Sequence, residues 1–581
     1  MGETRNGSEV IGKAARGGVG EPGWATFLGV VCLVILFANL GGAAFFEPDE
    51  GRNAEKAREI LLLDDWVTPH HNFLPTLDKP IAFYWPVALS FKLFGFSEWA
   101  ARLPSALAAL GCLLLVYQFA RRHWGARTAL WSCLVLATSI EFFFFARLVI
   151  LDMSLTFFIT LALLSFYSAV RTEEARSRFF HSVALYAALG AGTLIKGAVA
   201  VAVPGMVIFF YLLVTRQWSL LARLGLARGA LIYCAIVIPP YLWMEARNPG
   251  YLGYFLWEEH FVRYATPEFD RSKGWYYFIL VLAAGFFPWS ALLPLAARDM
   301  WRKKFADSIR FLVIWSLLPL VFFSFSKSQL PQYILPIFPA LALGIGRFLA
   351  EKFSGAGARR WSLVSAPWVF VIAVMSYLLV GAAWPNLLAR QARTAVALNT
   401  SSIAVCGVLF LVILGVFFSG YRRNWWRGWD AVYISTATGM ALFFIVLGQL
   451  MASASIARGS RSLAQISAPF IDSGDRVAFY DTYLPGIAFY LAADKPLWLA
   501  QYEEKDRIMG SNYLAARRPP AADGHGQVVY SFSEFAQQWN RQDLVLRVFV
   551  KEKNLQRLSL DVGATPRILT KYDEYLLVTN R

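Results

Sequence analysis

Residues 24–61 read WATFLGVVCLVILFANLGGAAFFEPDEGRNAEKAREIL and join two segments of opposite character. The part up to Phe46 carries no charged side chain and is long enough to cross a membrane as an α-helix. Three carboxylates follow at once, at Glu47, Asp49 and Glu50, and the residues after them have the pattern of a short amphipathic helix. The stretch therefore predicts a first membrane span that leads directly into an acidic helix at the membrane surface.

The composition of the whole chain supports a membrane fold. Of the 581 residues, 57% are hydrophobic and only 16% are charged, whereas a soluble chain carries about 25% charged residues. All five cysteines lie within apolar runs, where they are expected to pack as small core residues rather than to form a metal site or a disulfide framework. We therefore expect a polytopic α-helical membrane protein.

Apolar runs of about 17–23 residues predict about 13 membrane spans. These runs cover residues 24–46, 99–120, 127–145, 149–170, 179–195, 197–214, 226–246, 275–297, 309–325, 333–350, 362–383, 402–419 and 430–452. A further run, 80–96, contains Pro86 and Lys92 and is rich in aromatic residues. We expect this run to lie in the membrane interface as a helix rather than to cross.

The basic residues predict the orientation of the spans. If the N-terminal tail 1–23 is cytoplasmic, all Lys- and Arg-rich loops fall on the inner side, as the positive-inside rule requires. These loops are 121–127, 171–178, 215–228, 298–310, 347–361 and 421–427. Counting 80–96 as a span would invert every later loop. The net charge of +16 is thus accounted for by these loops, and no nucleic-acid-binding motif accompanies it.

The last part of the chain has the composition of a soluble domain. Four segments rich in β-branched and aromatic residues read as strands, and a segment between them reads as a short helix. The strands are 476–481, 527–532, 544–550 and 575–579, and the helix is 533–540. The expected organisation is a cytoplasmic tail (1–23), a transmembrane region (24–453) with an interfacial loop (47–98), and an outer α/β domain (454–581).

Ionisable side chains at membrane depth are costly, and by default they are candidates for function. In the predicted topology such groups, with one tyrosine, gather at the outer ends of the helices. They are Asp49, Glu50, Arg52, Asp78, Lys79, Arg147, Asp152, Lys196, His260, Arg263, Lys327 and Tyr333. Carboxylates and cations on one side predict a cavity for an anionic substrate near the outer leaflet.

Structural roles remain open for these residues at this stage. Asp49 can be the N-cap of the helix that follows it. Arg147 and Lys196 can extend to the interface from helix ends, and Tyr333 can belong to an aromatic belt. His260 has no second His or Cys at metal spacing, which makes ligation its less favoured role. The sequence contains no GxxxxGK[ST], HExxH or GxSxG motif of soluble enzymes.

Several motifs resemble a known family. The runs are PDEGRNAEKAREILLLDDWVTPH (48–70), LDKPIAFYW (77–85), LFGFSEWAARLPSAL (93–107), ARLVILDMSLTFF (146–158), LIKGAVAVAVPG (194–205), EEHFVRY (258–264) and SKSQLPQYILPIFPALAL (326–343). Together they resemble the lipid-linked glycosyltransferases of the GT-C superfamily. Within that superfamily they are most similar to the ArnT-like (4-amino-4-deoxy-L-arabinose transferase) branch of the protein-mannosyltransferase family.

The resemblance implies a fold, a reaction and a set of residues. The fold is of the GT-C type, with about 13 transmembrane helices, outer interfacial helices and a C-terminal periplasmic α/β domain. The catalytic carboxylates implied are Asp49 and Asp152. The implied substrate-binding residues are Glu50, Arg52, Lys79, Tyr84, Arg147, Lys196, His260, Arg263, Lys327 and Tyr333. Two departures, Ala198 in place of the family's usual proline and Gln329 in place of its usual lysine, bear on cavity geometry and acceptor choice.

The implied donor is a sugar on undecaprenyl phosphate, for example 4-amino-4-deoxy-L-arabinose, and the implied acceptor is lipid A or another periplasm-facing lipid or glycan. Membrane lipids are the other expected partners. The implied location is the bacterial inner membrane, with the active site and the C-terminal domain facing the periplasm. No fixed cofactor is implied; a divalent cation, with Asp49, Asp152 and His260 as candidate ligands, is left open.

Three alternatives remain at this stage. The same chemistry can serve a protein O-glycosyltransferase that uses a polyprenyl-phosphate sugar. A solute transporter is less favoured, because transporters usually carry inverted repeats and charges at the midplane of the bilayer. The third alternative is a structural or assembly subunit whose C-terminal domain docks a partner.

Overall fold

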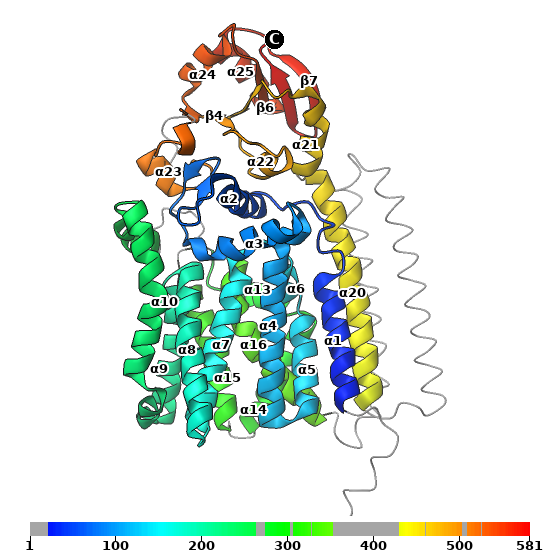
Figure 1. Ribbon diagram of the computed structural model, residues 1–581. Helices are drawn as coiled ribbons and strands as arrows, with labels where there is room; N and C mark the ends of the chain where they lie inside the picture. Colours follow the sequence, from blue (N-terminus) through cyan, green and yellow to red (C-terminus); the bar gives the residue numbers. More distant parts are fainter. Residues whose placement is uncertain are drawn as a thin grey trace, which may run out of the picture.

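The structure is a computed structural model that describes residues 21–262, 273–302, 306–326, 328–352, 429–458, 460–501, 508–524 and 526–581. Within these ranges the chain forms a helical bundle, a layer of short elements above it, and a C-terminal α/β domain above that layer (Figure 1). Two of the predicted spans, 362–383 and 402–419, lie outside the described residues.

The bundle consists mainly of long apolar helices that run roughly side by side, together with the shorter helices α6, α13 and α14 (Figure 1). They are α1 (Glu21–Phe37), α4 (Glu98–Trp124), α5 (Ala126–Ala137), α6 (Ile140–Ala146), α7 (Leu151–Arg171), α8 (Ala175–Lys196), α9 (Val199–Thr215), α10 (Leu226–Arg247), α13 (Tyr277–Gly285), α14 (Leu293–Arg302), α15 (Asp307–Ser324), α16 (Phe338–Lys352) and α20 (Trp429–Arg458). Among the described residues, 6 helices are long and apolar enough to cross a membrane, or up to 8 if each of two bent helix pairs is one span.

Two predicted spans are broken rather than straight. The run 127–145 forms α5 and α6, which meet at 69°. Thr138 and Ser139 lie at this break and donate side-chain hydrogen bonds to the carbonyls of Leu134 and Val135, a pattern that bends helices. The run 275–297 bends by 108° between α13 and the segment that begins at Trp289, next to Pro288, which has no N–H to continue a helix.

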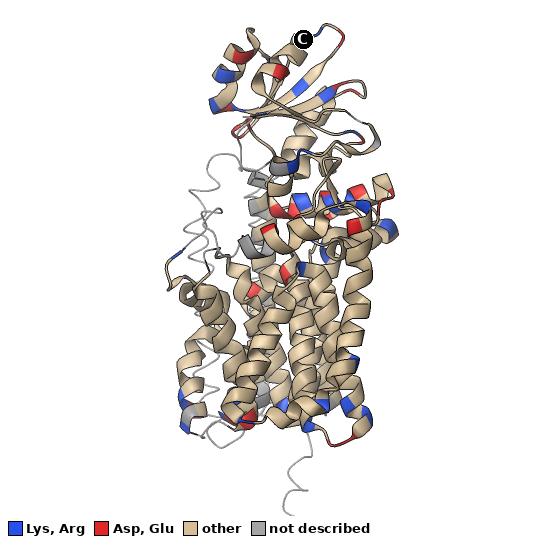
Figure 2. Cartoon of the chain, turned by 90° about the vertical axis from the view of Figure 1, so that its left-hand side faces the viewer, with Lys and Arg blue, Asp and Glu red and all other residues tan. Residues whose placement is uncertain are grey.

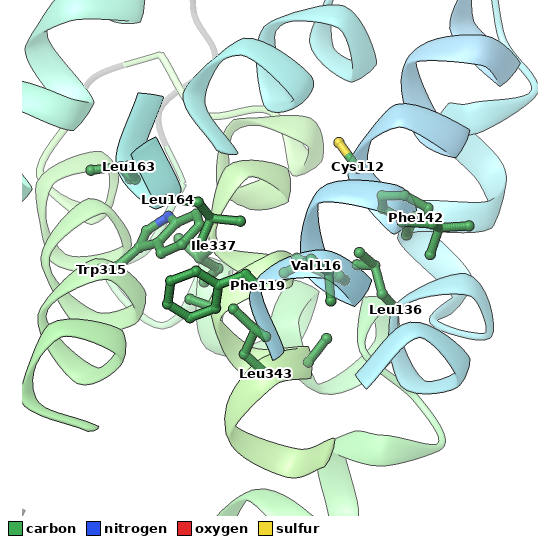
Figure 3. Packing of buried hydrophobic residues seen from close by; sticks show 14 of the residues in the cluster. Cys112, Val116, Phe119, Leu136, Phe142, Leu163, Leu164, Trp315, Ile337 and Leu343 are labelled. Carbon is green, nitrogen blue, oxygen red and sulfur yellow. The ribbon is translucent and has the colours of Figure 1, made fainter. Parts of the chain in front are cut away.

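Large apolar side chains fill the centre of the bundle. Phe119 of α4, Leu163 of α7, Trp315 of α15 and Leu343 of α16 belong to one buried cluster (Figure 3). The Trp315 indole N–H donates to the carbonyl of Pro336 at 2.9 Å, so its polar edge is satisfied inside the core. This packing supports the helix ends that carry the polar groups described below.

A layer of short elements covers the upper end of the bundle. It contains α2 (Asp49–Leu63), β1 (His70–His71) paired antiparallel with β2 (Leu74–Pro75), the 3-10 helix η1 (Ile81–Phe83) and α3 (Tyr84–Phe94). The short helix α11 (Tyr251–Gly253) and the π-helix η3 (Tyr254–Val262) follow α10. The apolar run 80–96 therefore lies in this layer, between the bundle and the C-terminal domain (Figure 1).

The C-terminal domain is built on a six-stranded mixed sheet of order β5-β4-β3-β6-β8-β7. The strands are β3 (Arg476–Tyr480), β4 (Trp498–Ala500), β5 (Val529–Tyr530), β6 (Leu546–Lys551), β7 (Arg567–Tyr572) and β8 (Tyr575–Thr579). The first four run parallel, with Ala478 opposite both Trp498 and Val548, and β7 and β8 add an antiparallel edge. The helices are α21 (Ser460–Ser467), α22 (Gly486–Tyr490), α23 (Asn512–Arg517), α24 (Phe532–Trp539) and α25 (Leu555–Val562).

Hydrogen bonds fix the C-terminal domain on the layer below. The Asn72 side chain donates to the Leu497 carbonyl and accepts from the Leu497 N–H, both at 2.7 Å. The Arg58 guanidinium donates to the carbonyl of Ala493 at 2.6 Å. The relative position of the two parts is therefore set by specific polar contacts, which matters because both parts line one cavity.

Candidate functional site

A cavity of about 420 Å³ lies where the bundle, the layer and the C-terminal domain meet. Charged residues of both signs crowd into this layer, whereas the far end of the bundle carries mainly Lys and Arg (Figure 2). Of the residues predicted from sequence, the cavity brings together Asp49, Arg52, Asp78, Lys79, Tyr84, Asp152, Lys196 and Tyr333.

Helix α2 presents one face to the cavity. Asp49, Arg52, Asn53 and Lys56 line it, and their spacing of three, four and seven residues places them on one side of a helix. The helix begins at Asp49 with Pro48 as its cap residue and has no side-chain capping bond. The alternative that Asp49 is the N-cap is therefore wrong. Its carboxylate is 63% exposed and lies 3.5 Å from the Arg52 guanidinium.

Lys56 is a cavity residue that sequence reasoning missed. It is 3% exposed, and its Nζ lies 5.6 Å from the centre of the Tyr84 ring. Burial lowers the pKa of this lysine to about 8. Smaller effects come from Asp78, which raises the pKa, and from Arg52, which lowers it further. Within the described ranges no carboxylate lies within ion-pair distance of Lys56. The sequence feature that indicates Lys56 is its position four residues after Arg52, on the same face of the predicted helix.

The segment after β2 supplies a carboxylate and a cation. Asp78 and Lys79 both line the cavity. The Tyr254 hydroxyl donates to Asp78 Oδ1 at 3.0 Å, and the Ser511 hydroxyl of the C-terminal domain donates to Asp78 Oδ2. Asp78 is thus held from two sides next to Lys79.

An ion pair lies on the bundle side of the cavity. Lys196, the last residue of α8, donates to the carboxylate of Asp152 in the first turn of α7. The Lys196 Nζ also lies 5.1 Å from the centre of the Tyr333 ring, within cation–π distance. Residues that lie far apart in the sequence therefore form one cluster. Apolar side chains, among them Leu155 and Phe323, line the cavity beside it.

Two predicted binding residues do not line the cavity. Glu50 is 1% exposed and accepts from Arg102 Nε at 2.9 Å, from Arg102 Nη2 at 2.8 Å and from the Val149 N–H at 2.9 Å. Arg147 donates to the carbonyls of Ile35, Leu36 and Ala38 at the end of α1. The contacts of Glu50 join α2 to α4, those of Arg147 join the end of α6 to the end of α1, and both sets indicate structural roles for these side chains.

For three other predicted residues, the side chains lie outside the described part of the structure. Arg263 and Lys327 lie outside the described residues, and His260 is placed only as part of the η3 backbone. In the part of the chain that the structure covers, no group of three or more His, Cys, Asp or Glu side chains is arranged to hold a metal ion.

Comparisons with known proteins agree with the motifs. The family model described as dolichyl-phosphate-mannose-protein mannosyltransferase matches residues 78–243. An undecaprenyl phosphate-alpha-4-amino-4-deoxy-L-arabinose arabinosyl transferase of Pseudomonas paraeruginosa is 36% identical over 310 residues, which are 53% of this chain and 56% of that protein. The transferase of the same name from Erwinia tasmaniensis is 34% identical over 59% of this chain and 62% of its own length. The matches therefore span little more than half of these curated relatives.

The similarity of fold extends over almost the whole chain. The crystal structure of ArnT from Cupriavidus metallidurans bound to undecaprenyl phosphate matches with a TM-score of 0.80 and 26% identity, covering 96% of this chain and 98% of that one. The resemblance to ArnT-like lipid-linked glycosyltransferases is thereby confirmed, and with it the helical membrane architecture of this group.

Proposed function

We propose that this protein is a membrane glycosyltransferase that moves a sugar from undecaprenyl phosphate to lipid A or a related acceptor. By analogy with the named activity of its relatives, the sugar is 4-amino-4-deoxy-L-arabinose. The proposed site is the cavity at the upper end of the bundle, and the observation that carries the proposal is the set of cations around it, Lys56 above all.

The cavity favours an anion for a simple electrostatic reason. A buried ammonium without a carboxylate partner is unfavourable, and a bound anion removes that penalty. Lys56 is in this position, while Arg52, Lys79 and Lys196 line the same cavity. A lipid-linked phosphate fits the arrangement, because its charged group meets these cations while its hydrocarbon lies against the apolar residues of α7 and α15.

The proposed reaction breaks the bond between the sugar C1 and the donor phosphate oxygen and forms a bond from C1 to an acceptor oxygen. Negative charge grows on the phosphate as the first bond breaks, and fixed cations stabilise that charge. Asp49 is more exposed than Asp152 and is therefore the carboxylate more accessible to an acceptor. It removes a proton from a hydroxyl acceptor or orients an acceptor that is already ionised. Asp152, paired with Lys196, positions the sugar.

We further propose that the cavity and the C-terminal domain face the periplasm from the bacterial inner membrane. The Lys and Arg residues at the opposite end of the bundle then lie in the cytoplasm, as the positive-inside rule requires (Figure 2). About 13 crossings are expected if the spans predicted beyond the described residues are included. A divalent cation is assigned no step in this scheme.

A second candidate is transfer of the sugar to a protein hydroxyl. It is favoured by the family model matched over residues 78–243, whose description names a protein mannosyltransferase. The two candidates share the donor, the cavity and the roles of the cations, and they differ in the acceptor.

The test is transfer by membranes that contain the protein, supplied with a lipid-linked aminopentose donor. Mass spectrometry of the lipid A fraction and of exported proteins identifies the acceptor. We expect lipid A to gain one aminopentose, and we expect Asp49→Asn to reduce transfer by about 10²–10⁴-fold. Asp543→Asn, at an exposed carboxylate of the C-terminal domain, is the matched control. Full activity of Asp49→Asn contradicts the role of Asp49, and a glycosylated protein with unmodified lipid A favours the second candidate.

A further inference from the structure

The C-terminal domain supplies part of the cavity wall through one tight turn. Ile508 and Ser511 are bonded in both directions, N–H to carbonyl, at 3.1 and 2.8 Å. Between them the backbone passes through Met509 and Gly510, which have φ of 51° and 77°. Gly510, Ser511 and the next residue, Asn512, line the cavity. This domain therefore contributes directly to the site formed by the membrane-embedded part.

The turn lies against helix α2. A Cβ atom at Gly510 would be 2.6 Å from Nη2 of Arg52, which is closer than non-bonded atoms approach. The positive φ of Gly510 favours glycine at this position, because a side chain there would be strained. The backbone of the turn therefore lies against a cation of the cavity.

The hydroxyl at the end of the turn is bonded to the site. Ser511 Oγ donates to Asp78 Oδ2, and the backbone N–H of Tyr513 donates to Asp78 Oδ1 at 3.4 Å. Tyr254 donates to the same Oδ1 from the other side. An ion pair between Arg517 and Glu258, at 3.5 Å, joins the same two segments at the surface. The Asp78 carboxylate is therefore held between the C-terminal domain and the segment after α10.

We propose that Ser511 is a positioning residue for the transfer reaction: by holding Asp78, it fixes the adjacent Lys79 and the electrostatic environment of Lys56 in the cavity, and thereby the affinity for the donor phosphate. This inference rests on the proposed function. It gives the C-terminal domain a role in the chemistry, in addition to covering the layer beneath it.

The electrostatics of the cavity explain how the effect reaches Lys56. Burial has the largest effect on the pKa of Lys56 and lowers it; Asp78 and Glu59 raise this pKa, and Arg52 and Lys79 lower it further. The rings of Tyr84 and His71 also border this part of the cavity. If Asp78 turns away, the pKa of Lys56 falls below its value of about 8, and less of the lysine is charged near neutral pH. Donor binding then weakens first at alkaline pH.

Ser511 also has a purely structural role, and the test must distinguish this role from its bond to Asp78. Its side chain accepts from the Leu514 N–H at 3.2 Å as the N-cap of α23. Ser511→Ala removes the cap and the bond to Asp78 together. Ser511→Asp retains a good cap but places a carboxylate against Asp78, and Ser511→Thr retains both interactions. Ser531→Ala is the matched control, because Ser531 caps α24 in the same domain through a capping box and does not line this cavity.

The experiment measures donor KM, kcat, their pH dependence and thermal unfolding for wild type and the four variants. We expect Ser511→Ala to lower kcat/KM about tenfold, mainly through KM, since the bond lost is made to a charged group. Its activity should also decline at a lower pH than that of the wild type. Ser511→Asp should lose more activity than Ser511→Ala although it retains the cap of α23, whereas Ser511→Thr and Ser531→Ala should retain wild-type kinetics.

Several results overturn the inference. These are an unchanged KM and pH profile in Ser511→Ala, full activity in Ser511→Asp, or an equal loss in Ser531→Ala. Binding of undecaprenyl phosphate, measured as a ligand-induced shift in unfolding temperature, is recorded for every variant. If the wild type transfers no sugar, the proposed function fails, and the binding data still decide whether Ser511 controls affinity for the phosphate.

Discussion

Replacement of Lys56 by methionine tests the central electrostatic feature of the cavity. Methionine has a similar length and shape but no charge, so the substitution removes a buried ammonium while keeping most of the packing. We expect two opposite effects: the free protein becomes more stable, and sugar transfer becomes slower. A lysine with a merely structural role would not produce this combination.

The size of the stability effect follows from the environment of the lysine. Lowering the pKa from 10.5 to about 8 corresponds to about 3 kcal/mol of unfavourable free energy for the charged form in the folded protein. The cation–π contact with Tyr84, 5.6 Å from the ring centre, is lost in the variant and offsets about 1–2 kcal/mol. The net stabilisation expected at pH 7 is therefore about 1–2 kcal/mol.

The pH dependence has a defined sign. Below about pH 8, Lys56 is charged in the folded and the unfolded protein, and the penalty is fully present. Between about 8 and 10.5 only the unfolded state binds the proton, so the stability contributed by this group rises with pH, by up to about 1.4 kcal/mol per pH unit. The advantage of Lys56→Met over the wild type should therefore shrink across this window.

The assay is thermal unfolding of the purified protein in detergent between pH 6.5 and 10, combined with transfer rates at pH 7. Lys553→Met, at an exposed lysine of the C-terminal domain, is the control and should change neither quantity. A Lys56→Met protein that unfolds at a lower temperature than wild type at pH 7, or one that transfers sugar at the wild-type rate, refutes the reasoning. An advantage that is constant from pH 7 to 10 also contradicts it.

Two further predictions concern the contacts that hold the layer in place. Arg102→Met should destabilise the protein by about 3–5 kcal/mol, because it leaves the carboxylate of Glu50 buried without its partner. Thermal unfolding measures this loss. Adding Glu50→Gln to the Arg102→Met protein should lower the stability less than the same substitution does in the wild type. Burial raises the pKa of Glu47, which accepts from the Gly486 N–H at 2.9 Å, from 4.5 to about 7. Since the folded state binds the extra proton between these values, wild-type stability should fall as the pH rises from 5 to 7, and Glu47→Gln should lose much of that dependence.

The sequence was sufficient to predict the helical membrane fold and the clustering of polar groups at one end. It could not distinguish the roles of Asp49 and Glu50. Successive residues of a helix point about 100° apart, so one carboxylate faces the cavity and its neighbour faces Arg102 of α4. Which neighbour faces which surface depends on how α2 is rotated against the bundle, and that rotation is set by distant contacts.

Long-range contacts also explain the other differences. Lys56 stands in an ordinary amphipathic pattern, and nothing local to it shows that it is almost completely buried in the folded chain. The turn at Gly510 is more than 400 residues from Arg52, and only the folded chain brings them together. Strand β4 has only three residues, too few for a clear alternating pattern. The two bent spans look like single straight helices in the sequence, because apolar residues continue on both sides of the bend.

On the proposed function, the charges that line the cavity affect the relative affinity for the donor and for the product. Each described carboxylate there already has a partner: Asp49 has Arg52, Asp152 has Lys196, and Asp78 accepts from Ser511 and Tyr254. On the proposed function, a donor phosphodiester would bring one negative charge to Lys56, and the phosphate monoester left after transfer would bring about two. The cations of the cavity should therefore attract the departing phosphate more strongly than the phosphate of the donor. On the proposed function, this difference lowers the barrier as charge develops and makes undecaprenyl phosphate a product inhibitor, which Lys56→Met should relieve.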